Sequence, residues 1–532
     1  MEINQTIIDI YSDACQKYSN NPIFSALGHT LSFQQLDLLS TQFAAYLQNQ
    51  TTLKVGDRVA IQLPNLLHYP VVALGVLKAG LVLVNTNPLY TERELLHQLQ
   101  DSGAKALVVL ENFADTVANV MAETELKYIF TAQVGDFHPG FKRILLNLVV
   151  KYGKRAVPNF NIPGRIDLRR AIKQGEKCTF QLVQRKPEDL ALLQYTGGTT
   201  GVAKGAMLSH GNLVANMIQA CEHLPDVYRI EQDCIAAPLP LYHIYAFTMH
   251  VLCSPYTGNH SILIPNPRDI SSVVKTFKDY PITCFIGLNT LYNALLHNAA
   301  FKRLNFKNLR NCSAGGMALT SDTATRWREL TGCAILEGYG LTEASPVVSS
   351  NQTGAIREGT IGTPVPGTEV KVVNDDGKAL PIGTPGELWV KGPQIMLGYW
   401  RRPKETQNVL TEEGWLKTGD IAQIDKDGYI KIVDRKKDMI LVSGFKVFPN
   451  EVEEVASMHP GVKECAAIGV PDENSGEVVK LVAVKAYPKV TAEEVRTFCR
   501  ERLTGYKVPK HIEFVAELPK SNVGKILRRE LK

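Results

Sequence analysis

The chain has 532 residues with 58 basic and 53 acidic side chains, and this near balance, a formal net charge of +5, argues against a nucleic-acid-binding protein. A composition of 45% hydrophobic and 21% charged residues is that of an ordinary globular protein, and the length suggests two or three domains. The 10 cysteines stand singly without a Cys-x-x-Cys pair, which favours a reduced cytoplasmic protein over a disulfide scaffold or a zinc site.

The beginning of the chain carries no feature of a signal peptide, because Met1-Glu2-Ile3-Asn4-Gln5 lacks both a basic and an apolar region. The longest apolar run, 71–84, is interrupted by Lys78 and is too short to cross a bilayer. We therefore expect a cytoplasmic protein whose contact with a membrane is at most peripheral, on the inner face. Self-association into a homodimer is a further expectation.

From residue 58 onward, short apolar runs alternate with helix-like stretches. The helix-like stretches are 69–79 and 91–101, and the strand-like runs are 58–63, 81–85, 105–110 and 128–131. Strands that alternate with helices predict βαβ units and a largely parallel sheet. Ligands of such sheets bind beyond the carboxyl ends of the strands, where the loop 85–90 would lie.

The stretch 141–157 breaks this alternation and has the pattern of a basic amphipathic helix. Its apolar residues at helical spacing are Phe141, Ile144, Leu145, Leu148, Val149 and Tyr152, and its basic residues are Lys142, Arg143, Lys151, Lys154 and Arg155. Such a helix lies in a membrane interface or packs on the body of the protein, and both interpretations stay open. A connecting loop is expected at 159–164.

The stretch 195–205 has the composition of a phosphate-binding loop. Its eleven residues include four glycines, three threonines and one lysine, and they follow the apolar run 190–193. Glycines let backbone N–H groups face an anion, threonines add hydroxyl donors, and the lysine adds a positive charge. The spacing is not that of the common P-loop, since Val202 rather than lysine follows Gly201, and a helical pattern begins only near Asn212. A flexible surface turn is the alternative interpretation.

The second half of the chain continues the alternation and then changes. Strand-like runs lie at 234–239, 261–264, 283–286 and 309–313. From 361, short strands at 369–374, 386–391 and 429–433 are separated by Pro- and Gly-rich turns, with hairpin patterns at 374–377 and 425–428. We predict an α/β fold with a large N-terminal domain, 1–433, of doubly wound α/β subdomains plus a small β-rich subdomain at about 361–433. A smaller mixed α/β C-terminal domain is predicted at 434–532.

Four further motifs follow the glycine-rich loop in the chain. They are Glu337-Gly338-Tyr339-Gly340-Leu341-Thr342-Glu343, Trp415-Leu416-Lys417-Thr418-Gly419-Asp420, Asp434-Arg435-Lys436-Lys437-Asp438 with Ser443-Gly444-Phe445-Lys446 after it, and Pro519-Lys520-Ser521-Asn522-Val523-Gly524-Lys525-Ile526. Each motif alone is compatible with a turn, a charged surface or a loop. In this order they resemble the adenylate-forming superfamily of acyl-CoA synthetases, peptide-synthetase adenylation domains and luciferases, over nearly the whole chain.

Four local stretches are similar to bacterial long-chain fatty acid CoA ligases. They are Asn87-Pro88-Leu89-Tyr90, Leu193-Gln194-Tyr195, Pro238-Leu239-Pro240-Leu241-Tyr242-His243 and Asp434-Arg435-Lys436-Lys437-Asp438-Met439-Ile440. The resemblance implies an acid-thiol ligase that uses ATP, Mg²⁺ and coenzyme A. A fatty acid and ATP first give an acyl-adenylate and pyrophosphate, and the thiolate of coenzyme A then displaces AMP.

The first step brings a carboxylate to an anionic phosphate. Two like charges 4 Å apart cost about 4 kcal/mol at an effective dielectric near 20. Positioned cations and hydrogen-bond donors are therefore needed along the phosphate chain. The resemblance implies Glu343 as the Mg²⁺ ligand, Lys525 as the bridge between the carboxylate and the α-phosphate, and His243 at the acyl site. Thr199, counted with these three as catalytic, is implied near the phosphates.

The resemblance also implies a nucleotide-binding set. Asp420 is expected to accept hydrogen bonds from the ribose, assisted by Arg435, and Tyr339 to stack on adenine. The other side of the adenine is expected to be lined by a strand, Gly315-Gly316-Met317. The remaining residues of the set are Thr196, Gly197, Gly198, Thr200, Lys204, Glu337, Gly338, Gly340, Thr342 and Ile432.

In this superfamily the C-terminal domain is mobile and swings about a hinge, implied here at Lys437, between the two half-reactions. The rotation removes Lys525 and brings a coenzyme A-binding set to the site, namely Ser443, Gly444, Phe445 and Lys446. Gly444 suits this role, because a residue without a side chain lets the pantetheine arm pass close to the backbone.

Two departures from the family pattern bear on the substrate. Only Gly258 is present in 254–259, where two adjacent glycines are usual, and Ala318 stands where proline is frequent. The first lies near the acyl pocket, so the chain-length preference stays open, with a medium-chain or aryl acid as the alternative substrate.

Other members of the superfamily fit the sequence less well. An amino-acid-activating domain is disfavoured because 241–247 has no acidic residue to pair with an ammonium group. A luciferase-like oxygenase is less favoured again. A catalytically idle lipid-binding protein is disfavoured because Glu343, Asp420, Arg435 and Lys525 are all present.

Overall fold

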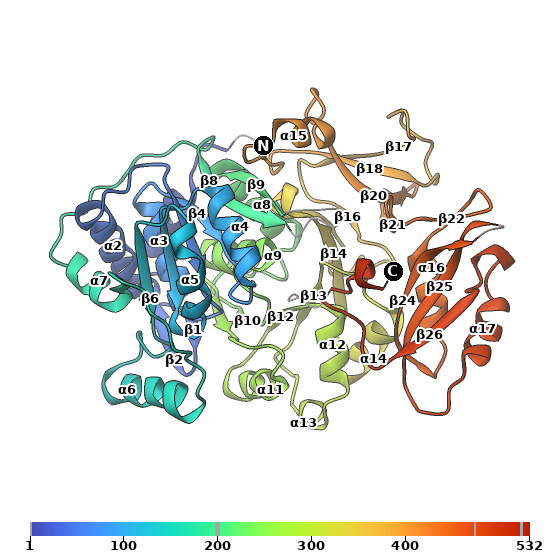
Figure 1. The fold of residues 1–532 in the computed structure, drawn as a ribbon, viewed down its shortest axis with the longest axis horizontal. Helices are drawn as coiled ribbons and strands as arrows, with labels where there is room; N and C mark the ends of the chain where they lie inside the picture. Colours follow the sequence, from blue (N-terminus) through green and yellow to red (C-terminus); the bar gives the residue numbers. More distant parts are fainter. Residues whose placement is uncertain (1–2, 197–202, 473–474, 522–524, 532) are drawn as a thin grey trace.

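Two large, mostly parallel sheets form the body of the chain (Figure 1). A computed structural model describes residues 3–196, 203–472, 475–521 and 525–531. The eight-stranded sheet has the order β19-β9-β8-β4-β3-β5-β6-β7, and all its neighbours pair in parallel except β8 with β9 and β9 with β19. Its strands are β3 Arg58–Gln62, β4 Val82–Asn85, β5 Ala106–Leu110, β6 Tyr128–Ala132, β7 Ile166–Asp167, β8 Leu190–Thr196, β9 Lys204–Ser209 and β19 Gly398–Tyr399.

The nine-stranded sheet has the order β16-β15-β14-β13-β12-β10-β11-β1-β2. Its strands from β1 to β14 pair in parallel, and the two ends are antiparallel. They are β1 Pro22–Ala26, β2 His29–Ser32, β10 Cys234–Ala237, β11 His260–Leu263, β12 Cys284–Gly287, β13 Asn311–Ala314, β14 Ile335–Gly340, β15 Val347–Ser350 and β16 Thr363–Pro364.

Helices cover both faces of the eight-stranded sheet, as the sequence predicted for doubly wound subdomains. Helices α2 and α3 share one hydrophobic core with the sheet, whereas α4 and α5 pack in a second core on the other face (Figure 1). Strands buried on both faces read as continuous apolar runs, which explains why they were recognisable in the sequence. The helices of this part are α1 Ile7–Lys17, α2 Phe33–Gln50, α3 His68–Lys78, α4 Glu92–Ser102, α5 Ala114–Val120, α6 Gly140–Leu148 and α7 Leu168–Gly175.

Side-chain caps fix where several helices begin. Thr91 accepts a hydrogen bond from the Glu94 N–H, and the Glu94 carboxylate accepts one from the Thr91 N–H, which starts α4 within one residue of the predicted position. Ser209 and Asn212 form the same reciprocal pair at the start of α8. The helices that follow are α8 His210–His223, α9 Ile244–Ala246, α10 Cys253–Tyr256, α11 Ile270–Asp279, α12 Asn289–Leu296, α13 Ala299–Lys302, α14 Ser321–Thr331 and α15 Pro403–Val409.

A four-stranded antiparallel sheet, β17-β18-β20-β21, forms the β-rich unit. The side chain of Asn374 accepts hydrogen bonds from the Asp376 and Lys378 N–H groups, which closes the predicted β17–β18 hairpin. Asp425 closes the β20–β21 hairpin in the same way. The strands are β17 Glu369–Val373, β18 Gly386–Lys391, β20 Leu416–Ile424 and β21 Ile430–Arg435.

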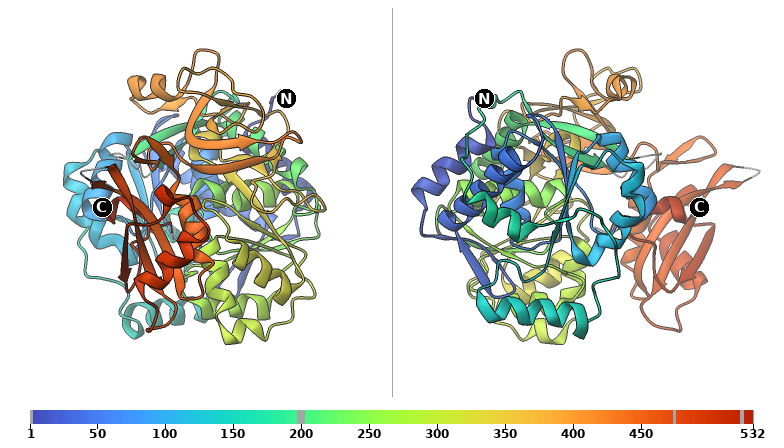
Figure 2. Two further views of the ribbon diagram at one scale, coloured as in Figure 1. Left: turned by 90° about the vertical axis from the view of Figure 1, so that its right-hand side faces the viewer. Right: turned by 60° about the vertical axis from the view of Figure 1, so that its left-hand side comes forward.

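The last part of the chain folds around a core of its own. Its two hydrophobic clusters contain only residues from Ile440 onward, and it stands to one side of the body (Figure 2). The prediction of an α/β protein with a large N-terminal and a small C-terminal domain is therefore confirmed. Its elements are β22 Ile440–Val442, β23 Phe445–Val447, α16 Pro449–Ser457, β24 Val462–Asp472, β25 Gly476–Lys485, α17 Ala492–Arg500 and β26 His511–Val515.

The structure differs from the expected elements in two places that matter for the site. Strand β9 follows the glycine-rich stretch, so this stretch connects two antiparallel strands, and α8 begins only at His210. Gly315-Gly316-Met317 is not a strand, because β13 ends at Ala314 and these three residues form the loop after it. The positive φ of +81° at Gly316 explains why this backbone leaves the strand.

Candidate active site

The glycine-rich stretch is framed by two paired residues. Thr196, the last residue of β8, faces Lys204, the first residue of β9, across the antiparallel pair. Gly197, Gly198, Thr199 and Thr200 lie outside the described residues. The structure therefore gives the position of both ends of this stretch, and the role of its interior stays a prediction.

We call the pair Thr196 and Lys204 the phosphate frame. Glu343 lies beside Lys204 in this frame. It belongs to a short 3₁₀ turn, Thr342–Ala344, and its Oε1 accepts a hydrogen bond of 2.7 Å from the Tyr399 hydroxyl. The Tyr399 ring in turn lies 5.1 Å from the Lys204 amino group. Burial, followed by the negative charge of Glu343, raises the pKa of Tyr399, so its hydroxyl stays protonated and remains a donor. The sequence did not single out Tyr399.

Asp101, at the end of α4, braces the same frame from the other side. Its carboxylate accepts hydrogen bonds from the Tyr195 hydroxyl at 2.7 Å and from Arg402 at 2.9 Å. The Trp400 indole N–H donates to its backbone carbonyl at 3.1 Å. Residues from β8, from α4 and from the segment after β19 are thus tied together at the base of the predicted phosphate site.

A second cluster surrounds Asp420 on β20. Tyr339 on β14 donates a short hydrogen bond to the Asp420 carboxylate, and Arg435 on β21 lies 3.4 Å from it. Asp420 and Arg435 face each other across the β20–β21 pair. Burial and then the charge of Asp420 raise the pKa of the Tyr339 hydroxyl, which keeps it a donor. Three of the predicted nucleotide-binding residues are therefore brought together, with Ile432 nearby on β21.

Glu337 connects β14 to the loop after β13. Its Oε1 accepts a hydrogen bond of 3.1 Å from the Leu319 N–H, so it fixes the Gly315–Met317 loop. Burial raises the pKa of Glu337 to about 7, although this N–H opposes the shift. A side chain at Gly315 would approach the Tyr245 ring to 3.2 Å, so the loop lies directly against the segment that carries His243.

The segment before His243 is held by buried amides. Asn65 donates to the carbonyl oxygens of Ala237 and Leu239, and Gln194 donates to that of Tyr242 at 3.0 Å. Asn85 donates to Gln194 at 2.9 Å. These residues lie at or just beyond the carboxyl ends of β3, β8 and β4, which is where the sequence placed a ligand site.

His243 is a neutral side chain that lies within reach of the charge of Lys525. Its Nδ1 accepts a hydrogen bond of 3.3 Å from the Tyr245 N–H. Burial, with a smaller contribution from the positive charge of Lys525, lowers the pKa of His243 to about 4. The Nε2 atom therefore carries the proton at neutral pH and is a hydrogen-bond donor.

Lys525 comes from the last residues of the chain and reaches this cluster. Its charge interacts with Arg435, Asp420, Lys437 and Arg528, as well as with His243. Burial and then the charge of Arg435 lower the pKa of Lys525 to about 8, against the effect of Asp420. Lys525 and Arg435 together carry one more charge than Asp420 offsets, whereas Lys437 and Arg528 lie beside Asp434, Asp438 and Glu453. An anionic ligand would offset this one charge.

Arg528, three residues after Lys525, anchors this segment, and the sequence did not single it out. Its guanidinium donates to both carboxylate oxygens of Glu453 at 2.8 Å and to Asn450 at 2.7 Å. It also lies 3.7 Å from Asp434 and 3.3 Å from Asp438. Because Asp434 and Asp438 flank Lys437, the anchor of the lysine segment lies at the predicted hinge.

The predicted coenzyme A residues lie in the first hairpin of the C-terminal domain, and the predicted hinge lies just before that hairpin. Lys437 is in the exposed turn between β21 and β22. Ser443 and Gly444, with φ of +49° and +81°, form the turn between β22 and β23. Phe445 is exposed and stacks on Tyr506 at 4.8 Å. The contact of Phe445 lies within the C-terminal domain, whereas the charge of Lys437 interacts with Asp420 and Lys525.

No group of three His, Cys, Asp or Glu side chains within the described ranges is placed to hold a metal ion unaided. Of the two carboxylates described beside the frame, that of Asp101 is engaged by Tyr195 and Arg402, whereas that of Glu343 accepts one hydrogen bond, from Tyr399. This donor set fits Mg²⁺, which commonly takes one or two carboxylates and completes its shell with phosphate oxygens and water.

Comparison with known families matches both parts of the chain. Residues 11–400 match the AMP-binding enzyme family, and residues 451–525 match the AMP-binding enzyme C-terminal domain. A long-chain-fatty-acid–CoA ligase of Escherichia coli O6:H1 is 50% identical over 529 residues, covering 99% of this chain and 94% of that protein. A long-chain-fatty-acid–CoA ligase of Bacillus subtilis is 37% identical over 533 residues, with the same coverage.

Solved structures share the fold at lower identity. The anthranilate CoA ligase AuaEII, in complex with anthranoyl-AMP, has a TM-score of 0.88 at 27% identity and covers 100% of this chain and 97% of its own. ATP-bound MatB from Rhodopseudomonas palustris has a TM-score of 0.86 at 29% identity, covering 99% and 98%.

Proposed function

The chain belongs to the AMP-binding enzyme family, and we propose that it is the long-chain fatty acid CoA ligase that its relatives' names indicate. Identity of 50% over 99% of the chain supports this activity, which converts a fatty acid, ATP and coenzyme A to acyl-CoA, AMP and pyrophosphate. The amino-acid-activating, luciferase-like and idle alternatives have no comparable support.

One observation carries the proposal: Lys525, from the end of the chain, lies in the same cluster as Asp420, Arg435 and His243. We infer that this arrangement serves the first half-reaction. Lys525 offsets the repulsion between the attacking carboxylate and the α-phosphate, and the carboxylate oxygen displaces pyrophosphate to form the acyl-adenylate. Asp420 accepts hydrogen bonds from the ribose, while Arg435 holds the Asp420 carboxylate in place.

The phosphate chain is proposed to lie along the frame formed by Thr196 and Lys204. Glu343 would hold Mg²⁺, whose charge supports departure of the pyrophosphate. Tyr399 fixes the orientation of the Glu343 carboxylate through its hydrogen bond. His243 is neutral, and its Nε2–H donates a hydrogen bond to the carboxylate of the acid. The proton stays on His243.

For the second half-reaction we propose rotation of the C-terminal domain about Lys437. The rotation withdraws Lys525 and brings Ser443, Gly444, Phe445 and Lys446 to the acyl-adenylate. The coenzyme A sulfur then attacks the acyl carbon, and AMP leaves with the electron pair of the broken bond. The exposed ring of Phe445 and the positive φ of Gly444 are compatible with a surface turn that docks onto another domain.

The direct test is pyrophosphate release with ATP, Mg²⁺ and a panel of acids, namely octanoate, palmitate, oleate, benzoate and ferulate, with and without coenzyme A. Release with palmitate and oleate, and acyl-CoA formation when coenzyme A is added, are expected. A preference for octanoate would move the assignment to a medium-chain acid, and a preference for benzoate or ferulate to an aryl acid. Absence of release with every acid would contradict the ligase.

Two statements about the setting of the enzyme also belong to the proposal. No helix in the described ranges is long and apolar enough to cross a membrane. We propose that the protein works in the cytoplasm and meets the inner face of the membrane peripherally. We further propose a homodimer, which light scattering of the purified protein would test.

A further inference from the structure

The helical segment 140–153, made of α6 and the π-helical turn η3 (Val149–Gly153), presents an apolar stripe to the exterior. None of its residues is buried. The apolar positions of the stripe recur three and four residues apart, so they share one helical face. Six of the twenty exposed large hydrophobic side chains of the described residues lie in this stripe, with exposed fractions from 41% to 75%: Phe141, Ile144, Leu145, Leu148, Val149 and Tyr152.

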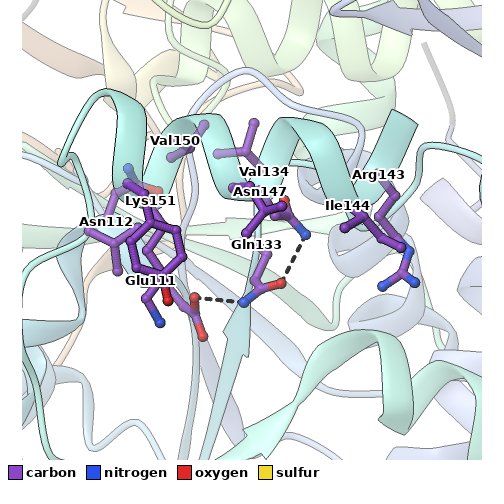
Figure 3. Close-up of a pocket in the computed structure, with 12 residues that line it drawn as sticks. Glu111, Asn112, Gln133, Val134, Arg143, Ile144, Asn147, Val150 and Lys151 are labelled. Carbon is purple, nitrogen blue, oxygen red and sulfur yellow. Dashed lines mark hydrogen bonds between the residues drawn. The ribbon is translucent and has the colours of Figure 1, made fainter. Parts of the chain in front are cut away.

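The opposite face of the segment is attached to the body. Asn147 accepts a hydrogen bond from the Gly135 N–H at 2.7 Å and donates to Gln133 at 2.9 Å, and Gln133 donates to Glu111 at 2.9 Å (Figure 3). Leu146 and Val150 are half-buried on the same face. A pocket of about 230 Å³ lies between the segment and the edge of the sheet. Three residues of the stripe, Ile144, Leu148 and Tyr152, also line this pocket, so the stripe begins at the edge of the attached side and continues onto the exposed side.

The charge around the stripe has one sign. No acidic residue occurs between Asp136 and Asp167. Arg165 pairs with Glu111 at 2.8 Å, but the other basic residues of this stretch have no acidic partner within 4 Å among the described residues. These five are Lys142, Arg143, Lys151, Lys154 and Arg155. Lys142 donates to the Gly28 carbonyl oxygen at 3.0 Å, and Arg143 and Lys151 line the pocket on the attached side, whereas Lys154 and Arg155 are exposed at the end of the segment. Exposed positive charge at the end of an apolar stripe is complementary to an anionic lipid surface.

The position of the segment relates it to the active site. Strands β8, β4, β3, β5 and β6 are adjacent and parallel, so the connection from β6 to α6 leaves the same edge of the sheet as the glycine-rich stretch after β8. Four strand spacings separate the two, which is about 19 Å. Helix α6 lies at the lower edge of the body in Figure 1, on the side opposite the C-terminal domain.

We propose that α6 and η3 dock the protein on an anionic lipid bilayer. The apolar stripe enters the boundary between headgroups and acyl chains, and the basic side chains bind the headgroup phosphates. Docking would place the catalytic edge of the sheet near a membrane-held fatty acid. That use rests on the proposed ligase function, whereas the docking itself does not.

A second copy of the chain is the competing occupant of this face. A symmetric contact through the stripe would bring two sets of five unpaired basic residues together. Like charges juxtaposed in an interface oppose association, so the charge pattern favours the lipid surface.

The test measures co-sedimentation of the full-length protein with vesicles, in the absence of substrate. One set of vesicles contains phosphatidylglycerol and phosphatidylcholine, and the other contains phosphatidylcholine alone. A charge variant carries Lys151→Gln, Lys154→Gln and Arg155→Gln, and an apolar variant carries Phe141→Ser, Leu145→Ser and Tyr152→Ser. The matched controls are exposed residues elsewhere: a triple variant with Lys177→Gln, Lys426→Gln and Lys489→Gln, and a single variant with Ile382→Ser.

The protein is expected to bind the anionic vesicles more tightly than the neutral ones, and less tightly as salt is raised. The charge variant should lose affinity about a hundredfold, since each basic residue near such a surface contributes about 1 kcal/mol. The apolar variant should lose binding to both kinds of vesicle, and the controls should behave as the wild type. Activity on octanoate without lipid should be unchanged in all variants, which separates loss of docking from loss of the ligase.

Two results would overturn the proposal. One is binding of the wild type and both α6 variants to anionic vesicles with equal affinity. The other is a dimer that the apolar variant converts to a monomer while its vesicle binding is retained, which would assign the face to a second copy. Because vesicle binding is measured without substrate, both of these results can be interpreted even if the proposed ligase reaction is not found.

Discussion

Glu343 and Lys525 belong to the same proposed site, but they are anchored in opposite ways. Glu343 is held inside the N-terminal domain, by the Tyr399 hydroxyl at its carboxylate and by the Met396 N–H at its backbone carbonyl. Lys525 is held by a local turn with Ser521 and by the ion pairs of Arg528 at the hinge. Glu343 is thus fixed inside the N-terminal domain, whereas the position of Lys525 depends on the position of the C-terminal domain.

The difference indicates a division of work between the two half-reactions. A carboxylate fixed within one domain stays beside the phosphate frame whatever the C-terminal domain does. Under the proposed rotation, a lysine whose anchor lies at the predicted hinge would be in the site in only one domain arrangement. Each of the following variants tests one side of this comparison.

Lys525→Ala should have the largest effect. Adenylation, followed as pyrophosphate release, should fall about a thousandfold, because one positioned charge at the reacting phosphate is lost. Thioester formation from preformed acyl-adenylate should change by less than about threefold, because the lysine has left the site by then. Lys520→Ala, which removes an amino group that pairs with Glu464 at 2.7 Å in the same hairpin, is the control. Equal loss in both half-reactions would end the distinction between the two anchors.

Arg528→Met should weaken the hinge-side anchor. Removing one partner from a partly buried ion-pair network leaves Glu453 and Asp434 uncompensated, and we expect a loss of about 3 kcal/mol in the stability of the C-terminal domain. Hydrogen exchange of α16 and β24 would report it. Arg529→Met is the matched control, because Arg529 is exposed and its ion pair is a long one, 3.9 Å from Glu530. Unchanged exchange in the Arg528 variant would show that the lysine segment is anchored elsewhere.

Tyr399→Phe tests the fixed side of the site. It removes the hydrogen bond that orients Glu343, and loss of such a partner typically costs at least about tenfold in metal affinity. The Mg²⁺ concentration for half-maximal adenylation should therefore rise about tenfold, with a smaller effect on the maximal rate at saturating Mg²⁺. Tyr429→Phe, which removes a hydroxyl bonded to the Ala355 carbonyl at 2.8 Å, should leave it unchanged. A lowered maximal rate without a shift in Mg²⁺ dependence would argue against this role of Tyr399.

Glu337→Gln is expected to act on stability, and the size of its effect depends on pH. The pKa of Glu337 is raised from 4.5 to about 7, so the folded state keeps a proton that the unfolded state loses between these values. Stability contributed by the protonated form is thus lost as the pH rises through this window, and the full cost of a buried charge remains above it. At pH 8 the glutamine variant should be more stable by up to about 3 kcal/mol, because each unit of pKa shift corresponds to about 1.4 kcal/mol, and near pH 4 it should match the wild type.

Thermal unfolding at the two pH values measures this difference. Glu454→Gln, at an exposed position of α16, is the control and should show no pH-dependent gain. A gain that is the same at both pH values would show that the glutamine acts through packing and not through the charge of Glu337.

The sequence alone predicted the strands whose residues are all buried. Strands β3 to β6 are buried on both faces, so their apolar runs predicted them within one or two residues. Strand β9 was missed because Lys-Gly-Ala-Met-Leu-Ser mixes polar and small residues, and its pairing with β8 rather than its composition makes it a strand. Gly315–Met317 was predicted as a strand, but it is a loop. Strand β13 ends on a small residue, Ala314, and two glycines follow it, so the sequence does not mark where the strand ends.

The site shows the same limit. Tyr339, Asp420, Arg435 and Lys525 stand in ordered motifs, and the structure brings these four together. Tyr399, Asp101 and Arg528 stand in no motif that marks them. Their hydrogen bonds join residues 56, 301 and 75 positions apart, and each is of a type that is frequent on surfaces. Only the folded chain shows which partners they meet.

The hairpin position of the glycine-rich stretch has a consequence for how anions are held and released. Where a phosphate loop opens directly into a helix, the aligned peptide dipoles place about half a positive charge behind the anion permanently. Here the whole of β9 separates the stretch from α8, so the stretch does not open into the N-terminus of α8. In the phosphate-binding role proposed for the stretch, attraction to the anion would then come from groups that approach it individually, and it would end when they withdraw. A product as highly charged as pyrophosphate is thus not retained by a fixed field.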